Sequence, residues 1–259
     1  MVSLNNKSVI VTGGGKGVGL SISKAFLDAG ADVTICGRRP PETLPSMNGR
    51  EAHFVTADVR KPEDSQAVID SVLERTGRLD ILVNNAGGSP PIKAAEAPTR
   101  LTESIIRLNL IAPMIMSQQA YHAMHGITDG VIINISSVSA ERPSPGTAAY
   151  GAAKAGLVNV TRSLAQEWGV DNIRVNAIIA GLIRTEASEE HYGGQRGIAM
   201  IEQALPMKRM AVPEDIANAC LFLAAPSSSY VSGAALEIYG GGEPPSFLRL
   251  AEEAHKLGS

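Results

Sequence analysis

The stretch Ser8-Val-Ile-Val-Thr12, followed by Gly13-Gly-Gly-Lys-Gly-Val-Gly19, decides how the rest of this chain is organised. Its first five residues form an apolar run typical of a fully buried strand, and Leu20 to Leu27 have the apolar spacing of a helix. A glycine turn between a strand and a helix suits a dinucleotide pyrophosphate, because the backbone can approach closely and free N–H groups face the anion. A glycine-rich run on its own also suits a flexible loop. In this position it predicts a dinucleotide-binding α/β fold.

Strands and helices are expected to alternate along the whole chain. Continuous apolar runs such as Val131-Ile-Ile-Asn-Ile suit a parallel sheet that is covered on both faces. The pattern predicts one domain with a Rossmann-type, doubly wound, seven-stranded parallel sheet and ligands at the carboxyl ends of its strands. We expect strands near 8–12, 32–36, 53–57, 80–84, 130–135, 173–179 and 235–239, and helices near 18–29, 63–76, 100–123, 149–168 and 213–224.

Composition agrees with this class of protein. A chain of 259 residues with 44% hydrophobic content can bury a full core. The net charge of −3 gives no general signal for nucleic acid, and no run of about 18 apolar residues predicts a membrane span. The first residues carry no long apolar run, so we expect no signal peptide. Cys36 and Cys220 are expected to be small buried residues rather than a disulfide or a metal pair. We therefore expect a cytoplasmic protein without a metal.

Tyr150-Gly-Ala-Ala-Lys154 has the spacing of a proton-transfer pair. A tyrosine and a lysine four residues apart share one helix face, so the ammonium can lie beneath the phenol. A nearby cation favours the charged form of a phenol, which otherwise ionises near pH ~10. Ser137, thirteen positions upstream, can hydrogen-bond the oxygen that gains or loses the proton.

Together these motifs resemble the short-chain dehydrogenase/reductase family in its compact single-domain form. The resemblance covers about Leu4 to Gly242, and the motifs follow in the family's order. Thr12-Gly13-x-x-x-Gly17-x-Gly19 matches the cofactor loop, Ala57-Asp58-Val59 the segment that holds the adenine, and Leu79 to Gly87 the fourth strand with its Asn-Asn-Ala-Gly turn. The resemblance implies a catalytic tetrad of Asn109, Ser137, Tyr150 and Lys154.

The resemblance also implies hydride transfer between a nicotinamide cofactor and a carbonyl/alcohol pair. Tyr150 would supply the proton, Ser137 would orient the substrate oxygen, and Lys154 would lower the Tyr150 pKa and bind the nicotinamide ribose. We expect the cofactor to contact Gly13, Gly15, Lys16, Gly17, Val18, Gly19, Arg38, Arg39, Asp58, Val59, Asn85, Ala86, Gly87, Tyr150, Lys154, Gly181, Ile183 and Thr185.

The charges after the second strand indicate which cofactor is used. A carboxylate there usually receives the ribose hydroxyls of NAD, whereas basic residues receive the 2′-phosphate of NADP. The strand ends in Cys36-Gly37-Arg38-Arg39 with no acid near, and Lys16 adds a cation from the glycine loop. Any one of these cations also suits a solvated loop. Together they predict NADP(H), because the guanidinium fork holds phosphate through two hydrogen bonds.

Pro113 follows Asn109 by four residues within a predicted helix. Proline has no N–H, so the carbonyl of Asn109 loses its helical partner and the helix is expected to bend. A free carbonyl at this point can hold a water. In the resembling family that water connects the lysine to solvent; a tolerated kink with an incidental asparagine is the alternative.

The region after the sixth strand is expected to cover the substrate. We expect residues 1–242 to form the catalytic domain, about 182–210 its substrate lid, and 243–259 a C-terminal extension with a short helix from Phe247 to Leu257. Ala180 replaces the proline that the family often has before Gly181. Lid methionines suit a pliable apolar pocket, so we expect an apolar ketone or 3-oxoacyl-type substrate; His191 and Tyr192 are expected at the surface.

Two alternatives stay open, and one further expectation concerns assembly. A catalytically silent NADP(H)-binding sensor or scaffold would keep the fold, although the complete tetrad argues against it. An epimerase or dehydratase generally carries a larger C-terminal region. Small residues on the Tyr150 helix permit close helix approach, and similar proteins pair this helix across two-fold axes. We therefore expect a homo-oligomer, either a tetramer or a dimer.

Overall fold

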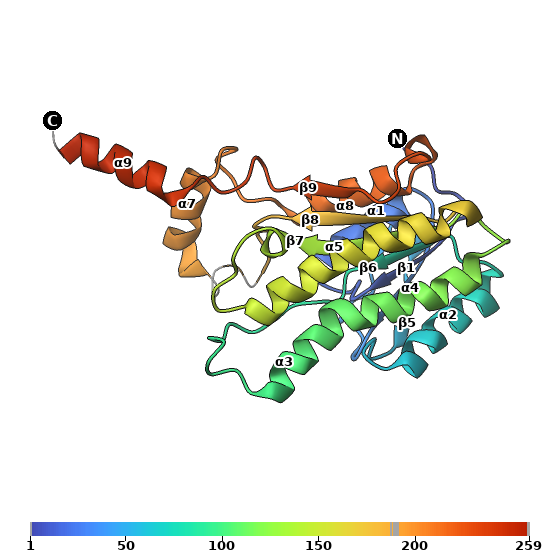
Figure 1. Cartoon of the computed structure of the whole chain (residues 1–259). Helices are drawn as coiled ribbons and strands as arrows, with labels where there is room; N and C mark the ends of the chain where they lie inside the picture. Colours follow the sequence, from blue (N-terminus) through green and yellow to red (C-terminus); the bar gives the residue numbers. More distant parts are fainter. Residues whose placement is uncertain (1, 187, 189–191, 258–259) are drawn as a thin grey trace.

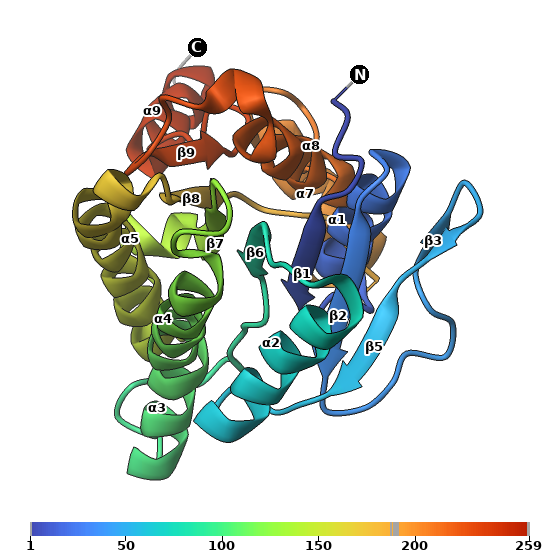
Figure 2. The same cartoon turned by 90° about the vertical axis from the view of Figure 1, so that its right-hand side faces the viewer.

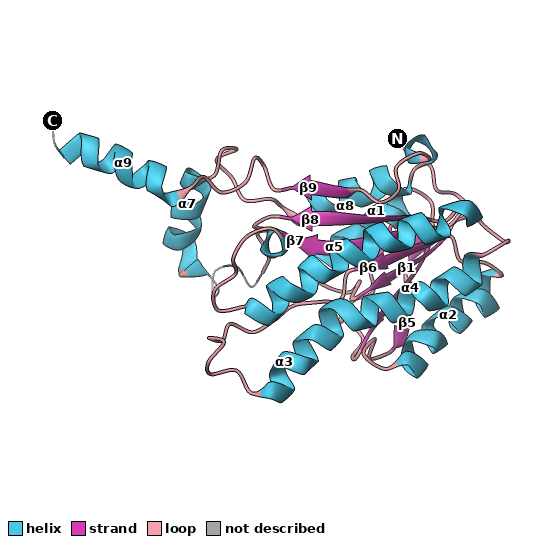
Figure 3. Ribbon diagram, in the orientation of Figure 1, coloured by secondary structure: helices cyan, strands magenta, loops and turns pink. Residues whose placement is uncertain are grey.

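The computed structural model describes residues 2–186, 188 and 192–257. Its centre is a seven-stranded sheet in the order β5-β2-β1-β6-β7-β8-β9, with every neighbouring pair parallel (Figure 3). The strand order reverses between β1 and β6, which places the topological switch point beside the glycine loop. The strands are β1 (Ser8–Thr12), β2 (Asp32–Gly37), β5 (His53–Thr56), β6 (Ile81–Asn84), β7 (Val131–Ser137), β8 (Arg174–Ala180) and β9 (Ala235–Ile238).

Helices cover both faces of this sheet, as the predicted doubly wound fold requires (Figure 2). Helices α1 and α8 pack on one face, and α2, α4 and α5 pack on the other. None of the helices in the described part of the chain is long and apolar enough to cross a membrane. The α-helices are α1 (Gly17–Asp28), α2 (Pro62–Thr76), α3 (Thr99–Ile106), α4 (Ala112–Met124), α5 (Ala148–Trp168), α7 (Gly194–Ala204), α8 (Pro213–Ala224) and α9 (Ser246–Leu257).

The alternation of side chains along each strand separates the core into two halves. Val9 and Val11 point toward α1 and α8, whereas Ile10 points toward α2, α4 and α5. All three are buried, and burial of each such side chain contributes roughly 2 kcal/mol. The two expected buried cysteines follow the same division, with Cys36 in β2 and Cys220 in α8, both as free thiols. The inner strands therefore carry apolar residues at successive positions, because helices cover both faces of the sheet.

The structure differs from the sequence-based expectations in three elements. The surface loop expected around the proline-rich segment continues into a small hairpin of β3 (Ser46–Met47) and β4 (Arg50–Glu51). The single helix expected over 100–123 is interrupted by a π-helical turn, Arg107–Ile111. The segment expected to form a lid contains an unexpected helix, α7, while the predicted C-terminal helix is confirmed as α9, which extends away from the sheet (Figure 1).

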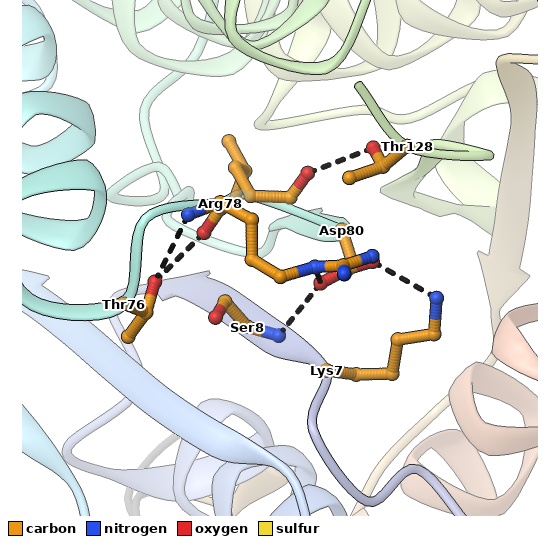
Figure 4. Close-up of polar contacts among 7 residues, drawn as sticks. Lys7, Ser8, Thr76, Arg78, Asp80 and Thr128 are labelled. Carbon is orange, nitrogen blue, oxygen red and sulfur yellow. Dashed lines mark hydrogen bonds and ion pairs between the residues drawn. The ribbon is translucent and has the colours of Figure 1, made fainter.

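A buried carboxylate joins the amino-terminal ends of β1 and β6 (Figure 4). Asp80 is 1% exposed and accepts hydrogen bonds from the Ser8 N–H, from Lys7 Nζ at 2.9 Å and from Arg78 at 2.6 and 2.8 Å. Burial alone raises the pKa of Asp80, but the hydrogen bonds from Arg78, Ser8 and Lys7 outweigh burial, so the pKa lies below its ordinary value. The ionised form of Asp80 therefore stabilises the fold.

Asp80→Asn is expected to lower the free energy of unfolding by about 2 kcal/mol at pH 7, measured by urea unfolding. The loss is moderate for a buried ion pair because Lys7 and Arg78 are 35% and 40% exposed and can turn to water. Since the folded pKa is depressed, the stabilisation is complete above the unfolded pKa near ~3.9 and disappears as pH falls through the folded pKa. A wild-type advantage that persisted unchanged at pH 2 would contradict this role.

Candidate active site

The glycine loop turns from β1 into α1 by a route that larger residues do not allow. Gly13 has φ +66° and donates its N–H to the Cys36 carbonyl at 2.9 Å. A Cβ on Gly19 would collide with the carbonyl oxygen of Gly13, so the first turn of α1 lies directly against the loop. The first-turn N–H groups of α1 have no intrahelical partners. The loop therefore fits a cofactor pyrophosphate, with Gly15, Gly17 and Val18 in the same turn.

Thr12 holds the Asn-Asn-Ala-Gly turn next to this loop. Its hydroxyl accepts the N–H groups of Asn85 and Ala86, each at 2.9 Å, and donates to the Val83 carbonyl at 3.3 Å. The Asn85 amide in turn donates to the Thr12 carbonyl at 2.9 Å. The carboxyl ends of β1 and β6 are thus joined at the switch point, and Thr12 positions residues that sequence reasoning assigned to the cofactor.

Asn109, Lys154 and Gly87 lie together although they are far apart in sequence. The Asn109 side chain, which is fully buried, accepts the Gly88 N–H and donates to the Gly88 carbonyl, both at 2.9 Å. A Cβ on Gly87 would lie 2.8 Å from Asn109 Oδ1 and 3.3 Å from Lys154 Nζ. Gly87 therefore leaves room beside the amide and the ammonium that a side chain would fill.

The π-helical turn explains how Asn109 reaches this position. The Ala112 N–H bonds to the carbonyl of Arg107, five residues earlier, and Pro113 follows without an N–H to donate. The predicted loss of a helical hydrogen bond before Pro113 coincides with this widened turn, which continues directly into α4. Asn109 Nδ2 also donates to the Ile105 carbonyl at 2.9 Å, so the side chain is anchored on both sides.

Lys154 and Tyr150 share one face of α5, as their spacing predicts. Lys154 Nζ lies 5.6 Å from the Tyr150 ring centroid and donates to the Ile135 carbonyl at 2.7 Å. Burial lowers the pKa of Lys154 to about 8. Ser136, the neighbour of Ser137, uses its hydroxyl to bond the Lys154 carbonyl at 3.1 Å, which fixes α5 against β7.

The pKa of Tyr150 is raised rather than lowered, so the expectation that Lys154 lowers it is wrong. Burial raises the pKa of the Tyr150 phenol above its ordinary value, the hydrogen bond with Ser137 opposes this rise, and the nearby Tyr192 adds to it. Desolvation prevails because the phenol itself is buried, and the same burial lowers the pKa of the neighbouring Lys154. Ser137 ends β7, and its Oγ also accepts the Ser139 N–H at 3.2 Å.

The three predicted cations come from two segments: Lys16 lies in the glycine loop, and Arg38 and Arg39 follow β2. Lys16, Arg38 and Arg39 are all exposed, and a Cβ on Gly15 would lie 3.1 Å from Pro41, so the segment after β2 closes over the loop. Asp58, expected to hold the adenine, follows β5. Its carboxylate pairs with Arg60 at 2.6 Å, and that hydrogen bond lowers the Asp58 pKa despite partial burial. Val59 lies between these two residues.

The segment after β8 runs along β9 before it enters the lid. A Cβ on Gly181 would lie 2.6 Å from the Tyr239 side chain, which explains a glycine here without the family's proline. Ile183 forms a parallel bridge with Ala211, and the Thr185 N–H donates to Ser188 at 2.7 Å. Tyr192, expected at the surface, packs instead with a lid cluster containing Ile198, Leu205 and Met210. His191 lies outside the described residues.

A buried polar network beneath the site was not predicted. Asn84 Nδ2 donates to Asn134 Oδ1 at 2.9 Å, and Asn134 Nδ2 donates to the Thr161 hydroxyl at 2.9 Å. Asn84 also bonds Ser117 of α4, so the network joins β6, β7, α4 and α5. The sequence signal was available, since Asn84 and Asn134 each interrupt an otherwise apolar strand.

Lys154→Met is expected to stabilise the fold. Burial of the ammonium at a pKa of about 8, against ~10.4 for a free lysine, costs about 3 kcal/mol at pH 7. Loss of the hydrogen bond to Ile135 offsets about 1 kcal/mol of the gain. Because the folded pKa is lowered, the cost is complete below pH 8 and vanishes as pH rises through the unfolded value. Denaturant unfolding at pH 7 and pH 10 tests this, and a variant less stable than wild type at pH 7 would contradict it.

No group of three His, Cys, Asp or Glu side chains within residues 2–186, 188 and 192–257 is arranged to hold a metal ion. The doubly wound sheet and its glycine loop at the switch point define a nicotinamide-dependent oxidoreductase of the Rossmann type. The close approach of Gly13 and Gly19 and the unpartnered first-turn N–H groups of α1 are the features that a bound pyrophosphate needs, so the residues present fit such a group.

Comparison with known proteins agrees with this class. The family model described as enoyl-(acyl carrier protein) reductase matches residues 13–242. The 3-oxoacyl-[acyl-carrier-protein] reductase FabG of Chlamydia trachomatis is 36% identical over 92% of this chain and 98% of its own. The 7alpha-hydroxysteroid dehydrogenase of Escherichia coli K12 is 33% identical over 92% and 95%. The ligand-free aldohexose dehydrogenase structure from Thermoplasma acidophilum has a TM-score of 0.86 at 29% identity, over 93% and 96%. The chain belongs to the short-chain dehydrogenase/reductase family.

Proposed function

We propose that this protein reduces an uncharged ketone or 3-oxoacyl compound with NADPH and catalyses the reverse oxidation of the alcohol. The observation that carries this proposal is the convergence of Asn109, Lys154 and Gly87 beside the Tyr150 helix, at the carboxyl ends of β6 and β7. FabG and the hydroxysteroid dehydrogenase, by their names, act on a 3-oxoacyl group and on a hydroxysteroid. Both substrate classes have an apolar body and one reacting oxygen.

Each member of the tetrad has its own task in this proposal. The cofactor, when bound, supplies the hydride. The Ser137 hydroxyl orients the substrate oxygen, and the Tyr150 hydroxyl donates its proton to that oxygen as the alcohol forms. The raised pKa of Tyr150 supports this role, because a phenol that keeps its proton is the form that reduction needs. The Lys154 ammonium stabilises the resulting phenolate, and Asn109 holds the Gly87-Gly88 backbone beside the lysine.

NADP(H) is proposed as the cofactor on the grounds of charge. Lys16, Arg38 and Arg39 are exposed, the segment after β2 closes over the glycine loop at Pro41, and residues 37–41 at the end of β2 include no carboxylate. Fluorescence titration with NADPH and NADH, followed by NADPH oxidation with neutral ketones and oxoacyl thioesters, tests the proposal. Tighter NADPH binding with turnover supports it. Binding without turnover of any ketone would favour a sensor or scaffold, and a preference for NADH would overturn the cofactor.

The proposal extends to the domain organisation, the location and the assembly of the protein. Residues 1–242 form the catalytic domain, with a lid at about 182–210 and an extension at 243–259. The protein acts as a cytoplasmic homo-oligomer, a tetramer or a dimer, paired through α5. Sedimentation analysis tests the assembly, and a purely monomeric protein at micromolar concentration would remove that part of the proposal.

A further inference from the structure

A cavity of about 250 Å³ begins one residue beyond Ser137. Ser137 ends β7 and is level with Ala180 in β8, so Val138 and Gly181 lead directly from the proposed reacting centre into the cavity wall. Apolar side chains of Val138, Leu182 and Leu205 form part of that wall. The charged residues on it are Glu141, Arg142 and Glu243.

Arg142 is already occupied by a residue of the C-terminal segment. Its Nε lies 2.6 Å from Glu243 Oε2, and its second terminal nitrogen donates to Glu243 Oε1 at 2.7 Å. This two-bond arrangement uses the guanidinium fork that would otherwise receive a carboxylate or phosphate. Arg142 and Glu243 are 41% and 33% exposed, so the pair lies at the rim rather than in the core.

The path of the chain places Glu243 at this rim. Gly240, Gly241 and Gly242 have φ of +62°, +91° and +78°, a run that other residues would adopt only with strain. The run turns the chain after Tyr239, whose ring is itself a wall of the cavity. Glu243 is therefore brought back to Arg142 by three consecutive left-handed residues.

The charge that remains around the cavity is negative. Two carboxyl groups and one guanidinium line it, and the guanidinium is paired. Glu237 lies close behind: burial raises the pKa of Glu141, and the charge of Glu237 raises it further against the smaller effect of Arg162. An anionic group of a substrate in this cavity is repelled by the two carboxylates that line it, and the lining guanidinium of Arg142 is already paired with Glu243.

We infer that the Arg142–Glu243 pair makes this cavity select neutral carbonyl compounds and reject those that carry a carboxylate or phosphate near the reacting oxygen. This inference rests on the proposed function, which places the reacting oxygen at Ser137 and Tyr150. Glu243 acts as a specificity-determining residue: it blocks the anion-binding fork of Arg142 and adds its own charge. The apolar wall accepts the uncharged body of the substrate.

The test compares ethyl acetoacetate with acetoacetate, which share a 3-oxo group and differ by one charge. Binding to the NADPH-loaded protein by calorimetry and kcat/KM by NADPH oxidation each give an ester-to-anion ratio. We expect a ratio of at least about 10 in the wild type, since one unfavourable charge contact of ~1.4 kcal/mol is tenfold. Glu243→Gln frees Arg142 and should lower the ratio about tenfold, whereas Arg142→Gln should raise it by a similar factor.

Arg75→Gln is the matched control, because Arg75 forms an equally exposed two-bond pair with Asp32 away from the cavity. It should leave the ratio unchanged. A wild-type ratio near one, or shifts of the two cavity variants in the same direction, would overturn the inference. Calorimetric ratios that shift as expected without turnover of either compound would support the cavity's selectivity and reject the proposed reductase activity.

Discussion

Tyr150→Phe is expected to lower kcat for carbonyl reduction by roughly 1000-fold, within the range that a positioned general acid contributes. The substitution removes only the hydroxyl, so the ring keeps its place over Lys154 and its packing on α5. Without that hydroxyl, Ser137 can still orient the substrate oxygen, but the proton donor that is hydrogen-bonded to Ser137 is lost. The measurement is single-turnover NADPH oxidation with a neutral ketone that the wild type reduces.

The NADPH dissociation constant separates a chemical defect from a folding or binding defect. It should change by less than about threefold in Tyr150→Phe, because the hydroxyl contributes no packing that the loop or α5 depends on. Tyr230→Phe is the matched control: Tyr230 is fully exposed, and its loss of a hydroxyl should leave kcat unchanged. If Tyr150→Phe kept more than a tenth of wild-type kcat, Tyr150 would not be the proton donor.

The second large effect concerns the cofactor. Gly37→Asp/Arg38→Ala is expected to lower the ratio of kcat/KM for NADPH to that for NADH by at least about 100-fold. Arg38→Ala removes a charge-assisted phosphate contact worth about 2 kcal/mol, and the new carboxylate repels the 2′-phosphate while accepting the ribose hydroxyls of NADH. The site accepts the change sterically, since a Cβ on Gly37 would lie 3.7 Å from the Arg39 carbonyl and 3.9 Å from Phe54.

The single variants show which part of the change acts. Arg38→Ala alone should weaken NADPH binding and leave NADH binding as it was, whereas Gly37→Asp alone should strengthen NADH binding as well. The salt dependence gives a separate check, because the wild-type preference for NADPH should decrease at high ionic strength if Lys16, Arg38 and Arg39 receive the phosphate. An unchanged cofactor ratio in the double variant would show that these cations are only solvated.

Much of the fold follows from local patterns in the chain. The inner strands β1, β2, β6, β7 and β8 are apolar runs, and strands alternate with helices along the chain, so the seven strands and the doubly wound fold were predicted. The hairpin at Ser46–Glu51 was not, because each of its strands has two exposed residues and no periodicity. The helix α7 was also missed, since it begins at paired glycines that indicate a loop.

The candidate site also has features that local sequence predicts and features that depend on tertiary structure. The spacing of Tyr150 and Lys154 on one helix is a local property, and the chain order predicted their shared face. The Gly87–Asn109–Lys154 grouping depends on three elements meeting, and the widened turn before Pro113 sets the direction of Asn109. The Tyr150 pKa was predicted in the wrong direction because desolvation is a property of the packed interior, which the spacing of a charge does not reveal.

The sequence by itself determined the class of fold and the family, and it supplied the groups that we propose exchange a proton, because these depend on periodicity, spacing and side-chain chemistry. The tertiary structure alone decided that Thr12 ties the two switch-point strands, that Tyr192 packs within the lid, and that Glu243 occupies the fork of Arg142. The last pair lies 101 positions apart. Such contacts form where distant segments of the chain meet, which local patterns in the sequence do not reveal.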